Sequence, residues 1–196
     1  MQASSLRAGT ITDACKATGI ALSTDMGRIR YYKWVRRASF LIAALTLLLS
    51  ACDTGSKPPR IGTVAPDFNV QDSDRKLALN QFRGEIVVLN FWATWCMPCI
   101  EEMPSLMQLQ QRLKDRGVTV LAVSVDTDAG AYRRFLHDHN ISLLTVRDEK
   151  QQSNNLYGTF KFPETYIIDR NGVMRRKFIG AVDWSQPEIT EFLTKL

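Results

Sequence analysis

The sequence predicts an α/β fold in which a mixed β-sheet is flanked by helices. Apolar, β-branched runs alternate with segments of helical periodicity between residues 86 and 146, an alternation typical of parallel strands connected by helices. Nearer the C-terminus, two further strand-like segments surround the dipeptide Asn171-Gly172, which is a strong signal for an antiparallel hairpin. Parallel and antiparallel strands are therefore expected together.

Two short strand-like segments, 68–70 and 77–79, open the predicted domain. The polar turn Asp72-Ser-Asp-Arg75 separates them, which predicts a small β-hairpin. The run 86–92 that follows is apolar almost throughout, a pattern typical of a strand buried on both faces. We expect it at the centre of the sheet.

A helix is expected after Cys96. Leucines recur at helical spacing over 106–113, Gly117 ends the pattern, and Pro104 should kink the helix. The run 118–125 predicts a second buried strand.

The remaining elements follow by the same criteria. Asp128 can cap a helix over 129–139, and 143–146 reads as a third strand. Strands over 165–168 and 173–179 form the C-terminal hairpin. The run Ser185-Gln-Pro-Glu188 resembles a capping box that opens a terminal helix to the end of the chain.

Composition and charge argue against a polyanion-binding protein. The chain of 196 residues is 45% hydrophobic and 23% charged, which is a globular composition, with a formal net charge of +5. Seven of its 25 Lys and Arg residues and two of its 20 Asp and Glu residues precede Cys52, which leaves 18 of each sign from there onward. The predicted domain is neutral, so no nucleic-acid partner is expected.

The front of the chain has the order of a secretory signal. Basic residues between 28 and 37 precede the apolar run 38–49, which is short for a membrane-spanning helix of about 20 residues. The run ends in Leu49-Ser-Ala-Cys52, which resembles a bacterial lipoprotein box and implies that Cys52 becomes lipidated. In that resemblance, an Asp at the position of Asp53 favours retention of the lipoprotein at the inner membrane. An uncleaved anchor and a plain signal peptide are the alternatives.

These observations divide the chain into four parts. Met26 stands where a signal peptide would begin, so 1–25 is interpreted as untranslated or non-structural and 26–51 as the lipoprotein-type signal peptide. Residues 52–60 are polar and Pro-containing and form a tether, and 61–196 form the domain. With Cys15 absent and Cys52 lipidated, one cysteine pair remains.

That pair, Cys96 and Cys99, is spaced for a redox-active disulfide. Residues at i and i+3 entering a helix can bring their Cβ atoms to the ~4 Å that a disulfide needs. At the helix N-terminus, the thiolate of Cys96 is stabilised by unpaired N–H groups and the helix dipole. Cys96 is therefore the predicted nucleophile, and Cys99, deeper in the fold, the residue that resolves the mixed disulfide.

Other uses of the pair fit the sequence less well. A structural zinc site needs two further ligands, and no second Cys or Cys/His pair is suitably spaced. A c-type haem site needs His where Ile100 stands. A purely structural disulfide across so short a loop would constrain little chain.

The motifs around the pair resemble the thioredoxin superfamily. The resemblance rests on Trp95-Cys-Met-Pro-Cys99 after a buried strand, on Pro104, and on Phe162-Pro-Glu-Thr-Tyr-Ile-Ile-Asp169 before a hairpin. The run Ala65-Pro-Asp-Phe68, an extra strand and helix within 120–146, and the anchor narrow it to the TlpA/ResA-like group, which includes cytochrome c maturation reductases.

The resemblance covers 61–196 and implies a thioredoxin-like fold with an N-terminal β-hairpin, an inserted strand-helix and no cofactor. It also implies that Pro163 is a cis-proline beside the disulfide. The residues that it places against the substrate are Trp95, Met97, Pro98, Phe162 and Pro163.

Two polar positions bear on the mechanism. Where thioredoxin has a buried Asp, this chain has Asn90, which cannot take a proton from Cys99. Glu102, one helical turn past Cys99, matches an acidic residue of ResA-like proteins and is the candidate proton acceptor. The alternative is that Glu102 is an ordinary surface residue. Glu164, after Pro163, is interpreted as a surface carboxylate that could help select partners.

Three further side chains are assigned ordinary roles. Trp92 is interpreted as packing around the site. His137 and His139 on the inserted helix are interpreted as exposed surface residues rather than metal ligands.

The dipeptide between the cysteines favours a reducing role. Met97-Pro98 carries no positive charge, whereas strong oxidants of the superfamily typically place a His there. Thioredoxin has a reduction potential of about −270 mV, and strong oxidants of the superfamily have about −120 mV. A reduction potential nearer that of thioredoxin is therefore expected. The resemblance then implies a membrane thiol transporter of the DsbD/CcdA type as electron donor.

The clients that the resemblance implies are the haem-attachment thiols of apocytochromes c or the copper-site cysteines of an oxidase assembly pathway. The protein is expected at a bacterial cell membrane, lipid-anchored, with its domain facing the periplasm or outer side. Two other classes remain open. A Sco-type copper chaperone usually spaces its cysteines one residue wider and adds a His. A peroxiredoxin is related through Ala65-Pro-Asp-Phe68 but lacks this resolving-Cys spacing.

Overall fold

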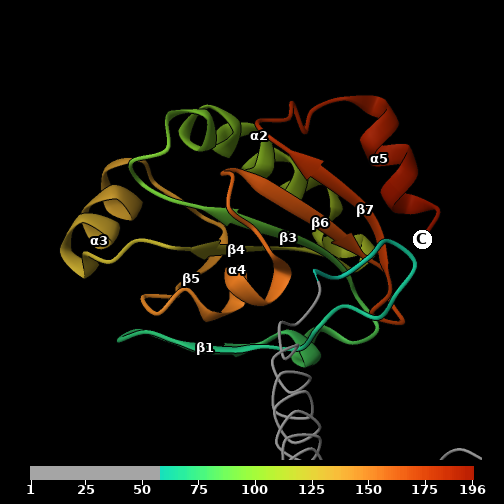
Figure 1. The fold of residues 1–196 in the computed structure, drawn as a ribbon. Coiled ribbons are helices and arrows are strands. Elements are labelled where there is room, and N and C mark those ends of the chain that lie inside the picture. The colour runs from blue at the N-terminus through green and yellow to red at the C-terminus, as the bar shows by residue number, and fades with distance from the viewer. Residues whose placement is uncertain (1–57) are drawn as a thin grey trace, which may run out of the picture. The chain divides into compact units, whose positions relative to one another are not determined.

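The computed structural model describes residues 58–196 (Figure 1). The segment 1–25 with Cys15, the proposed start at Met26, the signal peptide 26–51, Cys52 and tether residues up to 57 lie outside the described residues. Within 58–196, no helix has the length and apolarity needed to cross a membrane.

A five-stranded mixed sheet forms the centre of the fold, as expected. Its spatial order is β5-β4-β3-β6-β7. The pairs β3–β4 and β4–β5 are parallel, whereas β3–β6 and β6–β7 are antiparallel. The strands are β3 (Ile86–Trp92), β4 (Val118–Ser124), β5 (Leu144–Arg147), β6 (Glu164–Ile168) and β7 (Met174–Ile179).

Strand β3 is the central strand, and all seven of its residues are buried. Its side chains alternate between two apolar clusters, because successive residues of a strand point to opposite faces. Val88 and Trp92 belong to the first cluster, on one face of the sheet, and Leu89 and Phe91 belong to the second cluster, on the other face. The sequence prediction of a doubly buried central strand is confirmed.

Helices cover one face of the sheet, and smaller elements cover the other (Figure 1). Helices α2 (Met97–Leu113), α3 (Ala129–Asp138) and α5 (Pro187–Thr194) contribute to the first apolar cluster. The second cluster is closed by the antiparallel hairpin of β1 (Asn69–Gln71) and β2 (Lys76–Ala78), by the short helix α4 (Gln152–Tyr157), and by η1 (Leu79–Phe82). The N-terminal hairpin is confirmed.

Helix α2 begins directly after Cys96 and continues through Pro104. A 3-10 turn, η2 (Lys114–Arg116), follows it and ends at Gly117, whose φ of 70° lies in the left-handed region. Glycine is the usual residue for this helix-ending geometry because it lacks the Cβ that clashes there. The predicted stop at Gly117 is confirmed.

The two other predicted helix starts have different outcomes. Asp128 caps α3 by accepting the N–H groups of Gly130 and Ala131, as predicted. The capping box of α5 was wrong: the helix begins at Pro187, and the hydroxyl of Ser185 donates to Asp183 instead. Proline at the first helical position has a fixed φ suited to the helix, so the helix starts without a side-chain cap.

The short helix α4 was missing from the sequence prediction. It has six residues, too few for a periodic pattern to be recognised. Its Tyr157 is buried against Phe91 and Phe68 and donates from its hydroxyl to the carbonyl of Pro66 at 2.8 Å. Tertiary packing, more than local propensity, therefore accounts for this helix.

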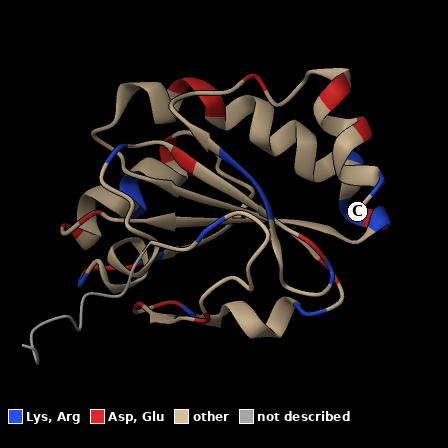
Figure 2. Cartoon of the chain, turned by 45° about the vertical axis from the view of Figure 1, so that its right-hand side comes forward, with Lys and Arg blue, Asp and Glu red and all other residues tan. Residues whose placement is uncertain are grey.

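Positive and negative residues are interspersed along the described chain (Figure 2). This distribution agrees with the charge balance read from the sequence.

Candidate active site

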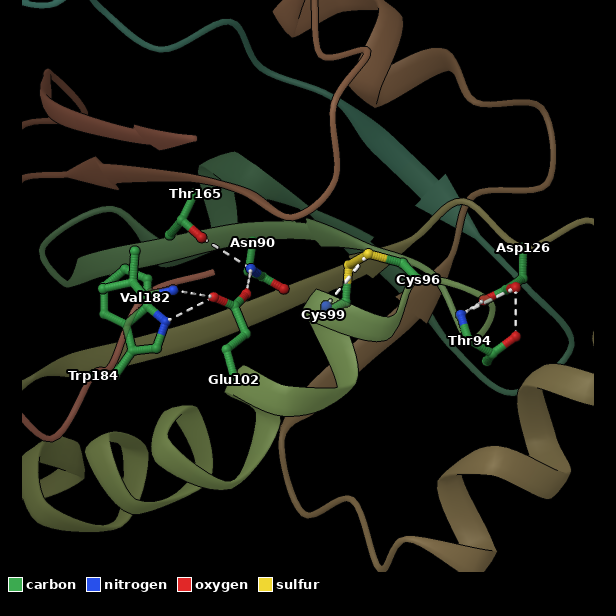
Figure 3. Close-up of a disulfide and its surroundings, with 9 residues drawn as sticks. All are labelled: Asn90, Thr94, Cys96, Cys99, Glu102, Asp126, Thr165, Val182 and Trp184. Atoms are coloured by element: carbon green, nitrogen blue, oxygen red, sulfur yellow. Dashed lines mark hydrogen bonds between the residues drawn. A yellow bond between two sulfur atoms is a disulfide. The ribbon is translucent and has the colours of Figure 1, made fainter. Parts of the chain in front are cut away.

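Cys96 and Cys99 form a disulfide at the start of α2 (Figure 3). Cys96 is the N-cap residue, and its Sγ accepts a hydrogen bond from the backbone N–H of Cys99 at 3.3 Å. Cys96 is 6% exposed, whereas Cys99 is 0% exposed. The two sulfurs thus differ in their access to solvent, and only that of Cys96 lies at the helix N-terminus.

The loop that leads into Cys96 is held by the carboxylate of Asp126. Its Oδ2 accepts the backbone N–H of Thr94 at 3.0 Å and the hydroxyl of Ser124 at 2.6 Å, and its Oδ1 accepts the hydroxyl of Thr94 at 2.7 Å. Asp126 is 3% exposed. This carboxylate therefore fixes the loop two residues before Cys96.

Asp126 was missing from the residues predicted for the site, although its place in the sequence carries a signal. It follows β4 closely, and Thr94 follows the neighbouring parallel strand β3. The carboxyl ends of neighbouring parallel strands lie at one edge of a sheet, so polar residues that follow them meet there.

Glu102 is 3% exposed and is therefore buried rather than on the surface. Its Oε1 accepts from Asn90 Nδ2 at 2.8 Å, and its Oε2 accepts from the N–H of Val182 at 3.0 Å and from Trp184 Nε1 at 3.3 Å (Figure 3). Burial raises the pKa of Glu102, although these three hydrogen bonds oppose part of that shift.

Glu102 is also close to solvent on one side. It lines a pocket of about 230 Å³ together with residues of its own helix and of the segment after β7, namely Glu101, Ser105, Ala181, Val182 and Asp183. A buried carboxylate with such an outlet can exchange protons with water.

Three of the residues expected to contact the substrate adjoin the cysteines in the chain, and the other two belong to the segment before β6. Trp95 and Met97 are 65% and 63% exposed, and Pro98 is exposed as well. Phe162 is half-buried and packs edge-to-face with Trp95, with 6.0 Å between ring centroids. Pro163 is buried, and the Phe162–Pro163 peptide bond is cis, as the resemblance implied.

One exposed aromatic residue close to Phe162 in the chain was missing from the predicted set. Phe160 is 76% exposed and lies two residues before Phe162. An aromatic residue in a short loop next to the proline was the available signal.

The interpretation of Glu164 as a surface carboxylate was wrong. Glu164 is 3% exposed and accepts hydrogen bonds from the hydroxyls of Thr159 and Tyr166, while Lys177 Nζ lies 2.7 Å from its Oε1. Strand β6 is internal to the sheet, so the side chain is covered, and Lys177 from the neighbouring strand β7 balances its charge. Buried charges of this kind are normally paired.

The two histidines are exposed, as expected. The side chain of His137 is 90% exposed and bonds Asp138, and His139 stacks on Phe135. Residues 58–196 contain no group of three or more His, Cys, Asp or Glu side chains arranged to hold a metal ion.

Comparison with known proteins agrees with this geometry. The model of the AhpC/TSA family matches residues 61–177. The chain is 31% identical over 144 residues to the thiol-disulfide oxidoreductase ResA of Bacillus thuringiensis subsp. konkukian, covering 73% of this chain and 82% of that protein. It is 36% identical over 123 residues to ResA of Geobacillus thermodenitrificans, covering 62% and 71%.

A solved structure is similar as well. It is the crystal structure of a putative thiol:disulfide interchange protein DsbE from Chlorobium tepidum, with a TM-score of 0.63 and 31% identity. The match covers 67% of this chain and 94% of that one.

Proposed function

Because the chain belongs to the AhpC/TSA family and is a thiol-disulfide oxidoreductase with a thioredoxin-like fold, homologous to ResA, we propose that it reduces the disulfides of client proteins. The observation that carries the proposal is the Cys96–Cys99 pair at the start of α2, with exposed apolar side chains beside it.

Cys96 is the proposed nucleophile. Its thiolate attacks one sulfur of the client disulfide, the client's other sulfur leaves as a thiolate, and a mixed disulfide forms between Cys96 and the client. The unpaired N–H groups at the start of α2, together with the helix dipole, favour this thiolate. Its small exposed area at the protein surface supports its role as the attacking residue.

Cys99 is the proposed resolving residue. It loses its proton and attacks the Sγ of Cys96, which expels the client's second thiolate and leaves the Cys96–Cys99 disulfide. Two electrons pass to the client, which leaves fully reduced. Glu102 is the proposed acceptor of the Cys99 proton, directly or through one water, and its raised pKa and solvent outlet support that role.

The client is proposed to dock over Trp95, Met97, Pro98, Phe162 and Pro163. Phe162 packs against Trp95, which precedes Cys96, and four of these residues present exposed or half-buried apolar surface. Large exposed apolar side chains clustered on one site are typical of an interaction surface.

Electrons are proposed to flow from the cytoplasmic side to the client. The uncharged dipeptide Met97-Pro98 supports a low potential, and a membrane thiol transporter of the DsbD/CcdA type is the proposed donor. Lipidation at Cys52 would hold the domain at the outer side of the membrane or in the periplasm, near that donor. The proposed clients are apocytochrome c thiols or copper-site cysteines.

A trapping experiment tests the proposal. In the full chain, Cys99→Ser leaves Cys96 able to attack but unable to be released, so mixed disulfides with clients should accumulate in the native cell. Cys96→Ser is the matched control and should trap none. Conjugates that form equally in both variants, or in neither, would contradict the assignment of the two cysteines.

Two simple measurements separate the alternatives. Peroxide consumption faster than protein-disulfide reduction would favour a peroxiredoxin-like activity. Stoichiometric copper binding that depends on the cysteine pair would favour a Sco-type chaperone.

A further inference from the structure

The carboxamide of Asn90 has one hydrogen-bonding atom without a partner beside the disulfide. Asn90 is fully buried, and its Nδ2 donates to Glu102 Oε1 at 2.8 Å and to Thr165 Oγ1 at 2.9 Å. Its Oδ1 is buried and has no hydrogen-bond partner within the described part of the chain. In Figure 3 this oxygen lies on the side of the carboxamide that faces Cys99.

The orientation of the carboxamide follows from the chemistry of its neighbours. When ionised, the carboxylate of Glu102 only accepts hydrogen bonds, so the NH₂ group of Asn90 faces it, as the structure shows. Glu102 is itself held by the N–H of Val182 and the indole of Trp184. A flipped carboxamide would bring two acceptor oxygens together, and Oδ1 is therefore directed toward Cys99.

We propose that Asn90 Oδ1 accepts a hydrogen bond from the thiol of Cys99 once the disulfide is reduced, which makes Asn90 a positioning residue for Cys99. The inference rests on the proposed function, in which Cys99 is the resolving thiol. Only reduction places a hydrogen on the Cys99 sulfur, so the oxygen gains its partner in the dithiol form and loses it in the disulfide form.

Two consequences follow for the cysteine pair. A hydrogen bond to the protonated form of a thiol disfavours its ionisation, so Cys99 stays a thiol while Cys96, at the helix N-terminus, carries the thiolate. A buried acceptor without a partner is unfavourable, so Asn90 stabilises the dithiol relative to the disulfide. The potential is then less negative than it would be with an apolar residue at this position.

Other titratable groups near Cys99 do not supply this bond. In the resting dithiol, the carboxylate of Glu102 on α2 accepts three other hydrogen bonds, and Asp126, after β4, accepts those of the loop before Cys96. Glu102 takes the Cys99 proton only at the resolving step. Asp183 and His139 are exposed. All four are retained when Asn90 alone is changed, so a difference between wild type and variant reports on the carboxamide.

Infrared spectroscopy of the reduced full-length protein tests the bond directly, because hydrogen bonding lowers the S–H stretching frequency. The Cys99 band is assigned by its loss in Cys99→Ser. In Asn90→Leu it should move to higher wavenumber. The equilibrium constant with glutathione should shift about tenfold toward the disulfide, which is about 30 mV more negative for a two-electron couple.

Val88→Ala is the matched control. Val88 lies on the same strand as Asn90 and is equally buried, and it belongs to the same apolar cluster as the disulfide. Its truncation therefore perturbs packing without removing a hydrogen-bond acceptor. Band position and potential should stay at their wild-type values. If Asn90→Leu does not fold, Asn90→Val carries the same expectation, because a β-branched residue suits a strand.

A Cys99 band at the same position in wild type and in the Asn90 variant would overturn the inference. Reduction of a protein disulfide by the wild type is measured separately. If the wild type does not reduce the protein disulfide, the proposed function is wrong, but a band shift would still show the hydrogen bond between Asn90 and Cys99. If the wild type is active but the Cys99 band is the same in wild type and in the Asn90 variant, only the proposed role of Asn90 is wrong.

Discussion

The carboxylate of Asp126 binds both the backbone N–H and the hydroxyl of Thr94, at 3.0 and 2.7 Å. This pair joins the residues after two neighbouring strands, β3 and β4, and fixes the loop that carries Trp95 and Cys96.

Asp126→Asn should therefore impair both stability and exchange. An amide nitrogen donates and cannot accept, so at least one of the hydrogen bonds that the carboxylate accepts from Thr94 and Ser124 is lost. Hydrogen bonds to charged groups contribute about 1.5–3 kcal/mol, and we expect a loss of that size in urea unfolding together with slower disulfide exchange. Asp128→Ala is the control: it removes the cap of α3 at a cost of about 1 kcal/mol and should leave exchange unchanged. Normal exchange in Asp126→Asn would contradict the positioning role.

The buried position of Glu102 predicts a pH-dependent stability. Burial raises its pKa above the ordinary value of 4.5, so the folded protein binds this proton more tightly than the unfolded chain. The stability contributed by the protonated group is fully present below pH 4.5 and is lost as pH rises through the raised folded pKa.

Glu102→Gln should remove this slope from the free energy of unfolding measured against pH, and should also alter the pH dependence of disulfide exchange. Glu101→Gln, at the neighbouring exposed position, is the control and should preserve both profiles. Exchange with an unchanged pH profile in Glu102→Gln would rule out Glu102 as the proton acceptor.

The ion pair between Glu164 and Lys177 should contribute more to the free energy of unfolding than the ion pairs on the surface do. Lys177→Met leaves the carboxylate of Glu164, 4% exposed, without its counter-charge. A fully buried pair costs about 3–5 kcal/mol to break, and because Lys177 is 30% exposed we expect about 1–3 kcal/mol after solvent screening. In Lys195→Met, which removes an exposed pair with Glu191, the loss should stay below about 0.5 kcal/mol. Equal losses in the two variants would indicate that Glu164 reaches water.

Trp95 should affect client recognition rather than stability. Its side chain is 65% exposed and packs against Phe162 beside the disulfide, so Trp95→Ala removes contact surface without opening a core cavity. With a disulfide-containing peptide as substrate, KM should rise by about tenfold, a value typical of one interface aromatic residue, with the unfolding midpoint nearly unchanged. Ile61→Ala, at a site 52% exposed, should leave KM as in wild type. An unchanged KM in Trp95→Ala would remove Trp95 from the docking surface.

The order of the elements and the redox pair could be predicted from the sequence because both depend on local patterns. A continuous apolar run such as 86–92 forms a strand buried on both faces, and the Asn171-Gly172 turn specifies a hairpin through its own backbone preferences. The spacing of Cys96 and Cys99 at a helix start likewise permits a disulfide by local geometry.

The surroundings of polar side chains were decided by the tertiary structure. Glu102 and Glu164 both looked like candidates for solvated carboxylates, yet each is buried, because partners distant in sequence or on a neighbouring strand supply hydrogen bonds or a counter-charge. For Glu102 the decisive donors, Val182 and Trp184, lie about 80 residues further along the chain. Periodicity reports which face of an element is apolar. It carries no information about which distant group meets a polar atom once the chain has folded, and that pairing sets both burial and pKa.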